Sequence, residues 1–393
     1  MVDGGNIVTK FNKGALLAVT SAVVLGGIAY GSVGVVGAFA QAKPVHHTVV
    51  KHQVKHPVVK RGAGPAVKLQ ETGSTLLWPL FQLWVPVYKH VAPKVDITTA
   101  GTGSGVGISQ ASDGVVQIGA SDAYMSNQKL KETPGMLNIP LAISAQQIMY
   151  KIPGISKNVH LKLTGTVIAD IYLGKIRYWN APQIRNLNKG VKLPHWAIVP
   201  IHRTDGSGDT FLFTQFMTDT NSAWSNSVQY GTSVSWPAVQ GALGANGNQG
   251  VVQTAEHTPG SIAYVGISWL NKGLQGGLGE AQLQNKAGRF LLPTPATVAA
   301  AANAQIKATP KDERISLIYG PGVNSYPIIN YEYAIVKNKQ ANANVANAVK
   351  NLLLWAINPK GGNTASFMNQ VHFLPLPASI APLSRNQIEQ IHG

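Results

Sequence analysis

The stretch 202–217, HRTDGSGDTFLFTQFM, places one arginine and two aspartates beside a Gly-Ser-Gly turn and an apolar run. Arg203 and the turn 206–208 have the composition of an anion cradle, because a guanidinium grips two oxygens at once and glycine lets the main chain approach a ligand closely. Asp205 and Asp209 conflict with that interpretation, since a carboxylate repels an anion. The stretch therefore raises the question of which ligand needs an anion cradle and a carboxylate in one site.

Two other loops share this design, ETGSTLL at 71–77 and GTGSGVG at 101–107. Like the first stretch, each places backbone N–H groups and one or two hydroxyls at the start of an expected helix, where the helix dipole also favours negative charge. One such loop alone usually only caps its helix, but three of them with a nearby arginine indicate an anion-binding site. The loop 101–107 has neither the lysine of a Walker A motif nor the distal acid of a dinucleotide fingerprint, so no nucleotide is expected.

The elements that would position these loops follow from the hydrophobic pattern after Val67, where apolar runs of strand length alternate with longer helical patterns. Strands are predicted at 95–101 and 115–122, and helices at 76–88, 167–176, 343–357 and within 291–316. Such alternation is typical of an α/β fold in which helices cover the sheet.

The chain has 393 residues, of which 45% are hydrophobic and 12% charged, and its net charge is +16. The positive excess is uneven, because residues 1–68 carry eight Lys or Arg against Asp3 alone, whereas the rest carries 24 against 15. That rest has no compact basic cluster with interleaved aromatics and no zinc, RRM or helix-turn-helix signature, so no nucleic-acid partner is expected. Cysteine is absent, which excludes disulfides, thiolate metal sites and lipid attachment to an N-terminal cysteine.

The N-terminal segment has the pattern of an export signal. Lys10 and Lys13 precede an uncharged run from Gly14 to Ala42, which ends in Ala-Gln-Ala and predicts cleavage before Lys43. The run is longer than a signal needs, and about 20 apolar residues span a bilayer, so an uncleaved signal anchor is the alternative. In either case we expect the remainder outside the cytoplasmic membrane, in the periplasm or at the cell surface.

Residues 43–68 follow this signal and contain six Lys or Arg, four of the eleven histidines and no acid. Three prolines oppose regular structure, and we expect residues 43–66 to form an extended basic linker that touches anionic envelope polymer or lipid. A metal site is the alternative use of its histidines, which are His46, His47, His52 and His56.

An enzyme has to be weighed against a binding protein. The turn 205–208 resembles that of serine hydrolases and His202 is close to it, but no G-x-S-x-G elbow follows a strand. Asp122 and Asp209 could form a metal pair for phosphate-ester hydrolysis, yet no His/Asp/Glu cluster at ligand spacing supports them. A binding protein is therefore favoured, and an ester hydrolase stays the alternative from another class.

Six blocks, in order along the chain, resemble the phosphate-binding protein (PstS) family of ABC-type phosphate importers, most of all its actinobacterial form. They are ETGSTLLWPLFQLW, AGTGSGVGISQ with IGASDAYM, LTGTVIADIYLGKIRYWNAPQI, HRTDGSGDTFLFTQFM, PGSIAYVGIS and YPIINYEYAIV, between Val67 and Leu376. The resemblance implies a periplasmic-binding-protein type II fold, with two α/β lobes, two crossover strands and a ligand cleft between the lobes. Crossovers near 147–152 and 328–336 would give lobe I as 67–149 plus 331–393 and lobe II as 150–330.

The resemblance also implies the ligand, inorganic phosphate. Its binding residues would be Thr75 and Leu76 through their backbone, Ser104, Asp122, Arg203, Ser207, Gly208 and Asp209. The protein would be a monomer without catalytic activity, cofactor or metal, which delivers phosphate to permease subunits in the membrane and contacts the envelope through residues 1–66. Two departures stand out: many relatives have threonine at position 209, and the cysteine pair of actinobacterial relatives is missing from 253–261, QTAEHTPGS.

The chemistry of the ligand explains the aspartates. Near neutral or acidic pH phosphate keeps at least one proton, which an ionised Asp122 accepts as a hydrogen bond, whereas sulfate would leave this carboxylate buried and unpaired. Arsenate is protonated like phosphate and would not be rejected, so arsenate and sulfate are the alternative ligands. Asp209 either accepts a second P–OH or pairs with Arg203 and caps the following helix.

Overall fold

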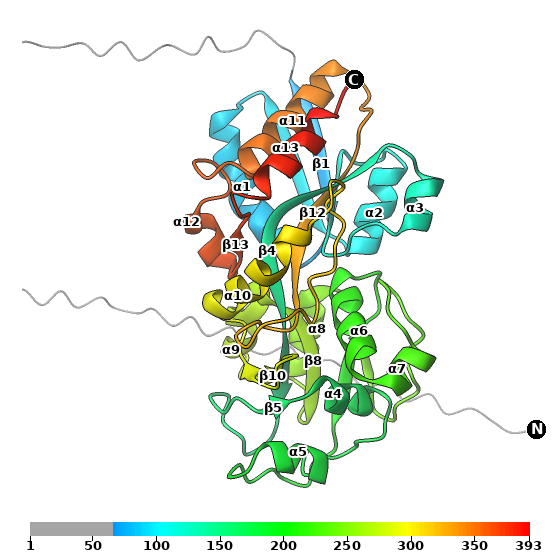
Figure 1. Cartoon of the computed structure of the whole chain (residues 1–393), viewed down its shortest axis with the longest axis vertical. Helices are drawn as coiled ribbons and strands as arrows, with labels where there is room; N and C mark the ends of the chain where they lie inside the picture. Colours follow the sequence, from blue (N-terminus) through cyan, green and yellow to red (C-terminus); the bar gives the residue numbers. More distant parts are fainter. Residues whose placement is uncertain (1–65) are drawn as a thin grey trace, which may run out of the picture. The chain divides into compact units, whose positions relative to one another are not determined.

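The computed structural model describes residues 66–393, and the predicted export signal and nearly all of the predicted linker lie outside these residues. The described strands form a ten-stranded mixed sheet and a three-stranded sheet, β11-β10-β5. The main path through the large sheet is β2-β1-β3-β12-β4-β8-β6-β7, and β9 and β13 pair with β4 beside it. Mixed pairing with helices between the strands confirms the predicted α/β class (Figure 1).

One half of the large sheet carries the first two predicted loops. β1 (Val67–Gly73) pairs in parallel with β2 (Val95–Gly101) and with β3 (Ile118–Ser121). Helix α1 (Trp78–Val91) follows β1, and α2 (Ser104–Ser112) follows β2. Because the carboxyl ends of parallel strands meet at one edge of the sheet, both loops come to lie beside the residue after β3, which is Asp122.

The other half carries the third loop. β6 (Val199–Arg203) pairs in parallel with β7 (Leu243–Ala245) and with β8 (Ser261–Gly266). Helix α6 (Gly208–Thr220) follows β6 after the predicted turn, and α8 (Gly247–Glu256) follows β7. This half therefore also presents two loops at the carboxyl ends of parallel strands.

A single long strand joins the two halves. β4 (Met136–Lys151) pairs antiparallel with β12 (Ile329–Lys337) up to Ala145 and with β8 from Gln146 onward, and Figure 1 shows it running through both halves. Every residue of β4 from Met136 to Tyr150 is buried, which places it at the centre of the core. The predicted crossovers fall on β4 and β12, while the exact division into lobes stays a prediction.

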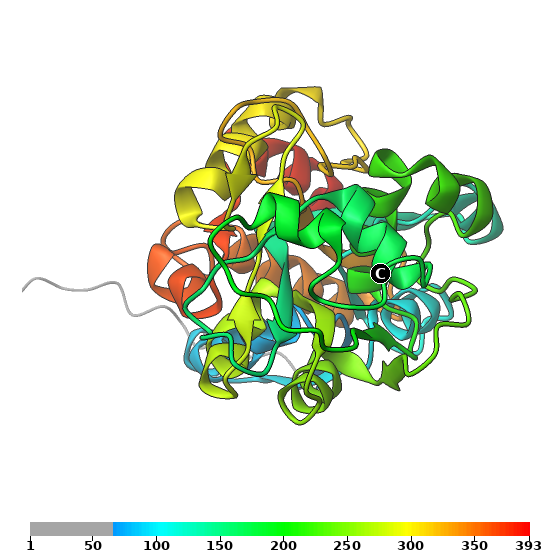
Figure 2. The same cartoon turned by 90° about the horizontal axis from the view of Figure 1, so that it is seen from below.

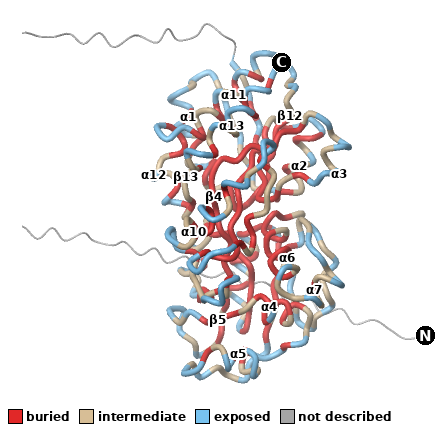
Figure 3. Tube along the Cα trace, in the orientation of Figure 1, coloured by how far each residue is buried: buried red, intermediate tan, exposed pale blue. Residues whose placement is uncertain are grey.

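The remaining helices surround the strands in two perpendicular views (Figures 1 and 2), and Figure 3 shows the buried residues concentrated between them. They are α3 (Asn127–Glu132), α4 (Gly165–Tyr172), α5 (Pro182–Leu187), α7 (Ser222–Ser227), α9 (Leu270–Gln275), α10 (Pro295–Gln305), α11 (Ala343–Ala356), α12 (Ala365–Met368) and α13 (Ala381–Glu389). The remaining strands are β5 (Lys162–Leu163), β9 (Gly279–Glu280), β10 (Gln282–Gln284), β11 (Phe290–Leu291) and β13 (Leu374–Pro375). Within 66–393, none of the helices combines the length and the apolar composition needed to cross a membrane.

The predicted elements are confirmed with shifted ends. α1 begins two residues later than predicted, with Pro79 in its first turn, where the missing N–H costs no hydrogen bond, and it continues past Pro86 to Val91. The strand predicted at 115–122 begins only at Ile118, because the chain turns at Gly114, whose φ is +73°.

Candidate functional site

The three predicted loops meet. The N–H of Gly105 in the second loop donates to the carbonyl of Gly206 in the third at 2.8 Å. A Cβ atom on Gly208 would lie 2.4 Å from Oδ2 of Asp122 and 2.6 Å from Oγ of Ser104, so the start of α6 abuts the end of β3. Only glycine fits there, and the contact joins the two halves of the sheet.

Asp122 lies at the centre of this contact and is 2% exposed. Its Oδ1 accepts a hydrogen bond from the Ser74 hydroxyl, and its Oδ2 lies 3.4 Å from Oγ of Ser104. Burial and the neighbouring Asp209 raise the pKa of the Asp122 carboxyl to about 7, against the lowering effect of the Ser74 hydrogen bond and the Arg203 charge. This carboxyl therefore titrates near neutrality, and its second oxygen faces the loop of α6.

Arg203 ends β6 and is held by both aspartates of the third loop. Its Nε donates to Oδ1 of Asp205 at 2.7 Å and its Nη2 donates to Oδ2 of the same carboxylate, a bidentate pair. Its Nη1 donates to Oδ2 of Asp209 at 3.0 Å. Although partial burial opposes it, the hydrogen bond and charge of Arg203 lower the pKa of Asp205, which stays ionised. The guanidinium is thus oriented by two carboxylates, only 3% exposed itself.

Asp209 has its oxygens occupied by the protein. Oδ2 accepts from Arg203 and, at 2.6 Å, from Nδ2 of Asn248, while Oδ1 accepts from Nε2 of Gln146 at 3.1 Å. The helix cap is Ser207, whose hydroxyl oxygen accepts from the N–H of Thr210 at 3.2 Å. The position of Asp209 therefore matches the predicted pairing with Arg203, and Asp209 lies in the first turn of α6 as expected, while the residue at the N-cap is Ser207.

The first loop contacts the other half of the sheet through Thr75. Its Oγ1 accepts from Nδ2 of Asn248 at 2.9 Å and from the N–H of the same residue at 3.1 Å. Its carbonyl accepts from Nε1 of Trp269 at 2.8 Å. The N–H of Leu76 donates within the loop to Oγ of Ser74, at 3.1 Å. Seven of the eight predicted site residues therefore lie on the three predicted stretches that the fold brings together, and the eighth, Asp122, follows β3 beside them.

Asn248 and Gln146 are members of this cluster that the sequence prediction missed. Asn248 is fully buried, donates to Thr75 and Asp209, and accepts from the N–H of Gly266 at 2.9 Å. Its stretch GANGNQG opens α8 with the same small-polar composition as the three loops, a signal that could have identified it. Gln146 stands out as a polar residue inside the apolar strand β4, which is the corresponding signal for a buried polar contact.

The residues that an enzyme would use as base, nucleophile or metal ligands do not lie together. His202 stacks on Trp236 with ring centroids 4.7 Å apart, and its Nδ1 faces the carbonyl of Arg203, while the Ser207 oxygen is bonded to Thr210. No group of three His, Cys, Asp or Glu side chains in residues 66–393 has an arrangement that could hold a metal ion. These residues therefore do not form a nucleophile–base pair or a metal centre.

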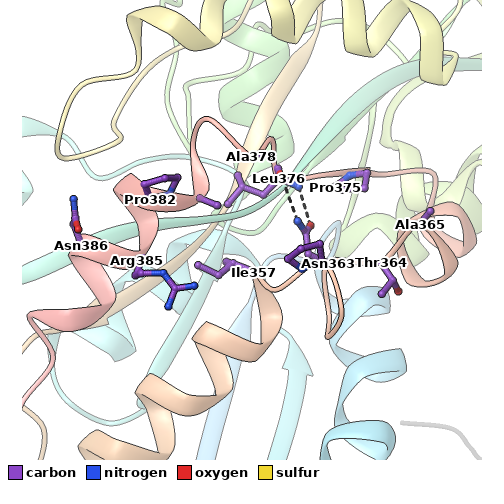
Figure 4. Close-up of a pocket in the computed structure, with 12 residues that line it drawn as sticks. Ile357, Asn363, Thr364, Ala365, Pro375, Leu376, Ala378, Pro382, Arg385 and Asn386 are labelled. Atoms are coloured by element: carbon purple, nitrogen blue, oxygen red, sulfur yellow. Dashed lines mark hydrogen bonds between the residues drawn. The ribbon is translucent and has the colours of Figure 1, made fainter.

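A separate cavity of about 620 Å³ lies beside α12 and α13 (Figure 4). Asn363 and Leu376 line it and are joined there by two hydrogen bonds, of 2.8 and 3.1 Å, and Arg385 extends along another side. It shares no residue with the three loops and is mostly apolar, so it does not belong to the anion site.

Comparison with known proteins agrees with this geometry. A family model of the PBP superfamily domain matches residues 59–360. Phosphate-binding protein PstS of Methanocaldococcus jannaschii is 31% identical over 345 residues, which cover 82% of this chain and 86% of that protein. PstS of Pasteurella multocida is 33% identical over 78% of this chain and 86% of its own length.

This chain belongs to the phosphate-binding protein PstS family. Solved structures show the same periplasmic-binding-protein type II fold. Phosphate binding protein from Stenotrophomonas maltophilia matches with a TM-score of 0.60 and 18% identity, over 81% of this chain and 93% of that one. A putative phosphate ABC transporter substrate-binding protein from Clostridium perfringens, with bound phosphate, matches with a TM-score of 0.56 and 18% identity, over 79% of this chain and all of the other. The predicted family and fold are therefore confirmed.

Proposed function

We propose that this PstS-family protein captures inorganic phosphate between the three loops and delivers it to the membrane permease of an ABC importer. The observation that carries the proposal is the buried Asp122 carboxyl, which faces the N-terminus of α6 beside Ser104 and Gly208. A carboxylate among anion-binding groups suits an anion that brings its own proton, and relatives named phosphate-binding proteins match over most of the chain.

The proposed binding residues have donors to offer. The Ser207 oxygen accepts from the N–H of Thr210, so its hydroxyl proton can point to a ligand. The Ser104 hydroxyl donates to Oδ2 of Asp122 at 3.4 Å, a long hydrogen bond that a bound phosphate oxygen would replace. The backbone N–H groups of Thr75 and Gly208 lie at two helix starts, where the dipole favours an anion, and the N–H of Leu76, which donates to Oγ of Ser74 at 3.1 Å, would be shared with the ligand. Arg203 supplies the positive charge.

Asp122 would then decide which anion is bound. An ionised Asp122 accepts the P–OH hydrogen bond of phosphate, while sulfate would place oxygen lone pairs against a buried carboxylate. Asp209 contributes by holding Arg203 in place and not by contacting the ligand, because donors from the protein already engage both of its oxygens.

We further propose that the protein acts outside the cytoplasmic membrane, exported by its N-terminal segment, and works without a cofactor and without catalysis. Closure of the two halves around the ion would present a composite surface to the permease. Residues 1–66 would keep the protein near the membrane or the envelope polymer.

Calorimetric titration of the purified protein with phosphate, arsenate and sulfate tests this function. We expect phosphate and arsenate to bind, and sulfate to bind about a thousandfold more weakly, since a buried unpaired carboxylate costs about 4 kcal/mol. Equal binding of sulfate would contradict the role of Asp122. Turnover of a chromogenic phosphate ester would instead identify a hydrolase.

A further inference from the structure

A second carboxyl lies directly behind the anion site and is not one of the predicted site residues. Glu332, on β12, is fully buried and lies beside Asp122, because β12 pairs with β3 at Tyr333 and Ser121 and Nδ2 of Asn330 donates to the carbonyl of Asp122 at 3.3 Å. Two buried carboxylates in contact repel each other strongly unless a proton lies between them. The contact therefore requires that one of the two groups is a carboxylic acid.

The neighbours of Glu332 indicate which of its oxygens takes part. Oε1 accepts from the amide of Asn330 at 3.0 Å and contacts the hydroxyl of Ser144 on β4. Oε2 is buried and has no hydrogen-bond partner among the described residues. A proton on Oε2, donated to Asp122, gives every polar atom of the glutamic acid a partner.

The groups around the pair affect the pKa values of Asp122 and Glu332 to different extents. Asp209 and Arg203, from α6 and β6, act on Asp122, whereas Glu332 is surrounded by Asp122, Ser144 and Asn330. Burial and the Asp122 charge raise the pKa of Glu332 well above the ordinary glutamate value, and the pKa of Asp122 is raised to only about 7. Asp122 also accepts from the hydroxyls of Ser74 and Ser104, which favour its ionised form, so as pH rises Asp122 ionises first while Glu332 keeps its proton.

We propose that Glu332 is a positioning residue for phosphate binding, because its protonated carboxyl donates a hydrogen bond to Asp122 and so lets an ionised Asp122 accept the hydrogen bond of the ligand's P–OH. This proposal rests on the phosphate-binding function proposed above. Loss of the Glu332 proton places two adjacent carboxylates behind the ligand, so it sets the alkaline limit of phosphate binding.

Glu332→Gln tests the proposal with little change of shape. Its amide oxygen can accept from Asn330, and its amide nitrogen is a permanent donor to Asp122 that cannot be titrated. Glu280→Gln is the matched control, since Glu280 is a buried glutamate on β9 with one unpartnered oxygen and lies outside the anion site. The wild type and both variants meet the same mixture of phosphate species at a given pH. The ratio of wild-type Kd to variant Kd is therefore independent of the ionisation of phosphate itself.

Phosphate Kd is measured by calorimetry from acidic to alkaline pH. In the alkaline range, we expect the ratio of wild-type Kd to Glu332→Gln Kd to rise by up to about tenfold per pH unit, the slope for one linked proton. The Glu280→Gln ratio should stay constant. A constant Glu332→Gln ratio would overturn the proposal while leaving phosphate binding intact, whereas absence of phosphate binding by the wild-type protein at every pH would overturn both.

A second variant serves if Glu332→Gln does not fold. In Asp122→Asn the new amide can donate to Glu332, so the pair no longer needs a proton. We expect this variant to bind phosphate more weakly than the wild type, but with an alkaline loss of affinity that is less steep by about one proton. An unchanged slope in Asp122→Asn would contradict the shared proton.

Discussion

Replacing Asp122 by asparagine is the sharpest test of how this site selects its ligand. The two side chains have the same shape, so Ser74 can still donate to Oδ1, while an amide replaces the Oδ2 that lies 3.4 Å from Ser104. Phosphate then loses a charged acceptor for its proton. Sulfate gains, because its lone pairs meet an N–H donor where they met a carboxylate.

The magnitude follows from the burial of this carboxyl, which is 2% exposed and cannot be solvated by water in the closed site. Leaving it unpaired against sulfate costs about 4 kcal/mol, or about three decades of binding. A charge-assisted hydrogen bond to phosphate is worth about 1.5–3 kcal/mol, so phosphate affinity should fall by about 10-fold to 150-fold. The ratio of sulfate Kd to phosphate Kd should therefore decrease by at least two decades in Asp122→Asn.

The pH of the assay matters because the pKa of Asp122 is raised to about 7. Above this value the wild-type carboxylate rejects sulfate, and below it the neutral acid can donate a hydrogen bond to sulfate, so selectivity should decline as the solution becomes acidic. Calorimetry with both anions is performed at one pH on each side and at constant ionic strength. An unchanged selectivity of Asp122→Asn on the alkaline side would refute the reasoning.

Single substitutions of four other buried residues test separate parts of the structure. Gly208→Ala should abolish phosphate binding in calorimetry, because the added Cβ would lie 2.4 Å from Oδ2 of Asp122 and 2.6 Å from Oγ of Ser104; retained affinity would refute the close approach. Asn248→Ala should weaken phosphate binding by about 10-fold to 100-fold through loss of the buried hydrogen bonds that join the first and third loops, with a control titration at higher phosphate to confirm saturation. Asp209→Asn should lower the free energy of unfolding by about 1–3 kcal/mol in urea and leave phosphate selectivity unchanged, because Asp209 orients Arg203 without touching the ligand. Burial raises the pKa of Glu313 to about 8, so between pH 4.5 and 8 the folded protein holds a proton that the unfolded chain releases. The stabilisation from this proton is complete below pH 4.5 and is lost as the pH rises to about 8. The free energy of unfolding of Glu313→Gln, measured in urea, should therefore depend less on pH than that of the wild type.

Much of the fold could be predicted because its signals are local. The small-polar loop before α6 and the apolar run within it locate this helix, and the turn at Gly208 marks its start. The close approach of Gly208 to Asp122 could not be read from the pattern, since it depends on two strands about eighty residues apart that lie on different halves of the sheet. Sequence periodicity describes which face of an element is buried, but it does not say which loops meet.

The same limit explains why Asn248 and Glu332 were missed. Each has its partners far away in the sequence, and neither is part of a Gly/Ser turn with a hydroxyl. Glu332 lies in a strand whose residues are otherwise almost all apolar or aromatic, and a charged residue in such a run indicates a buried polar partner without naming it. Family resemblance supplied the residues proposed to bind the ligand, but not the residues that support them.

The charges of the site have a consequence for how it attracts an anion. Above the pKa of Asp122, the carboxylates of Asp122 and Asp205 already outnumber the single guanidinium of Arg203, so the net charge of the site is negative even when Asp209, whose pKa is raised by burial, and Glu332 are protonated. The net charge of the site therefore cannot attract the anionic ligand. Attraction must come from dipoles fixed in place, the N–H groups and hydroxyls at three helix starts, which act over short distances in a buried site. This explains why three separate loops supply donors to one small ion, and why glycine is needed where those loops touch.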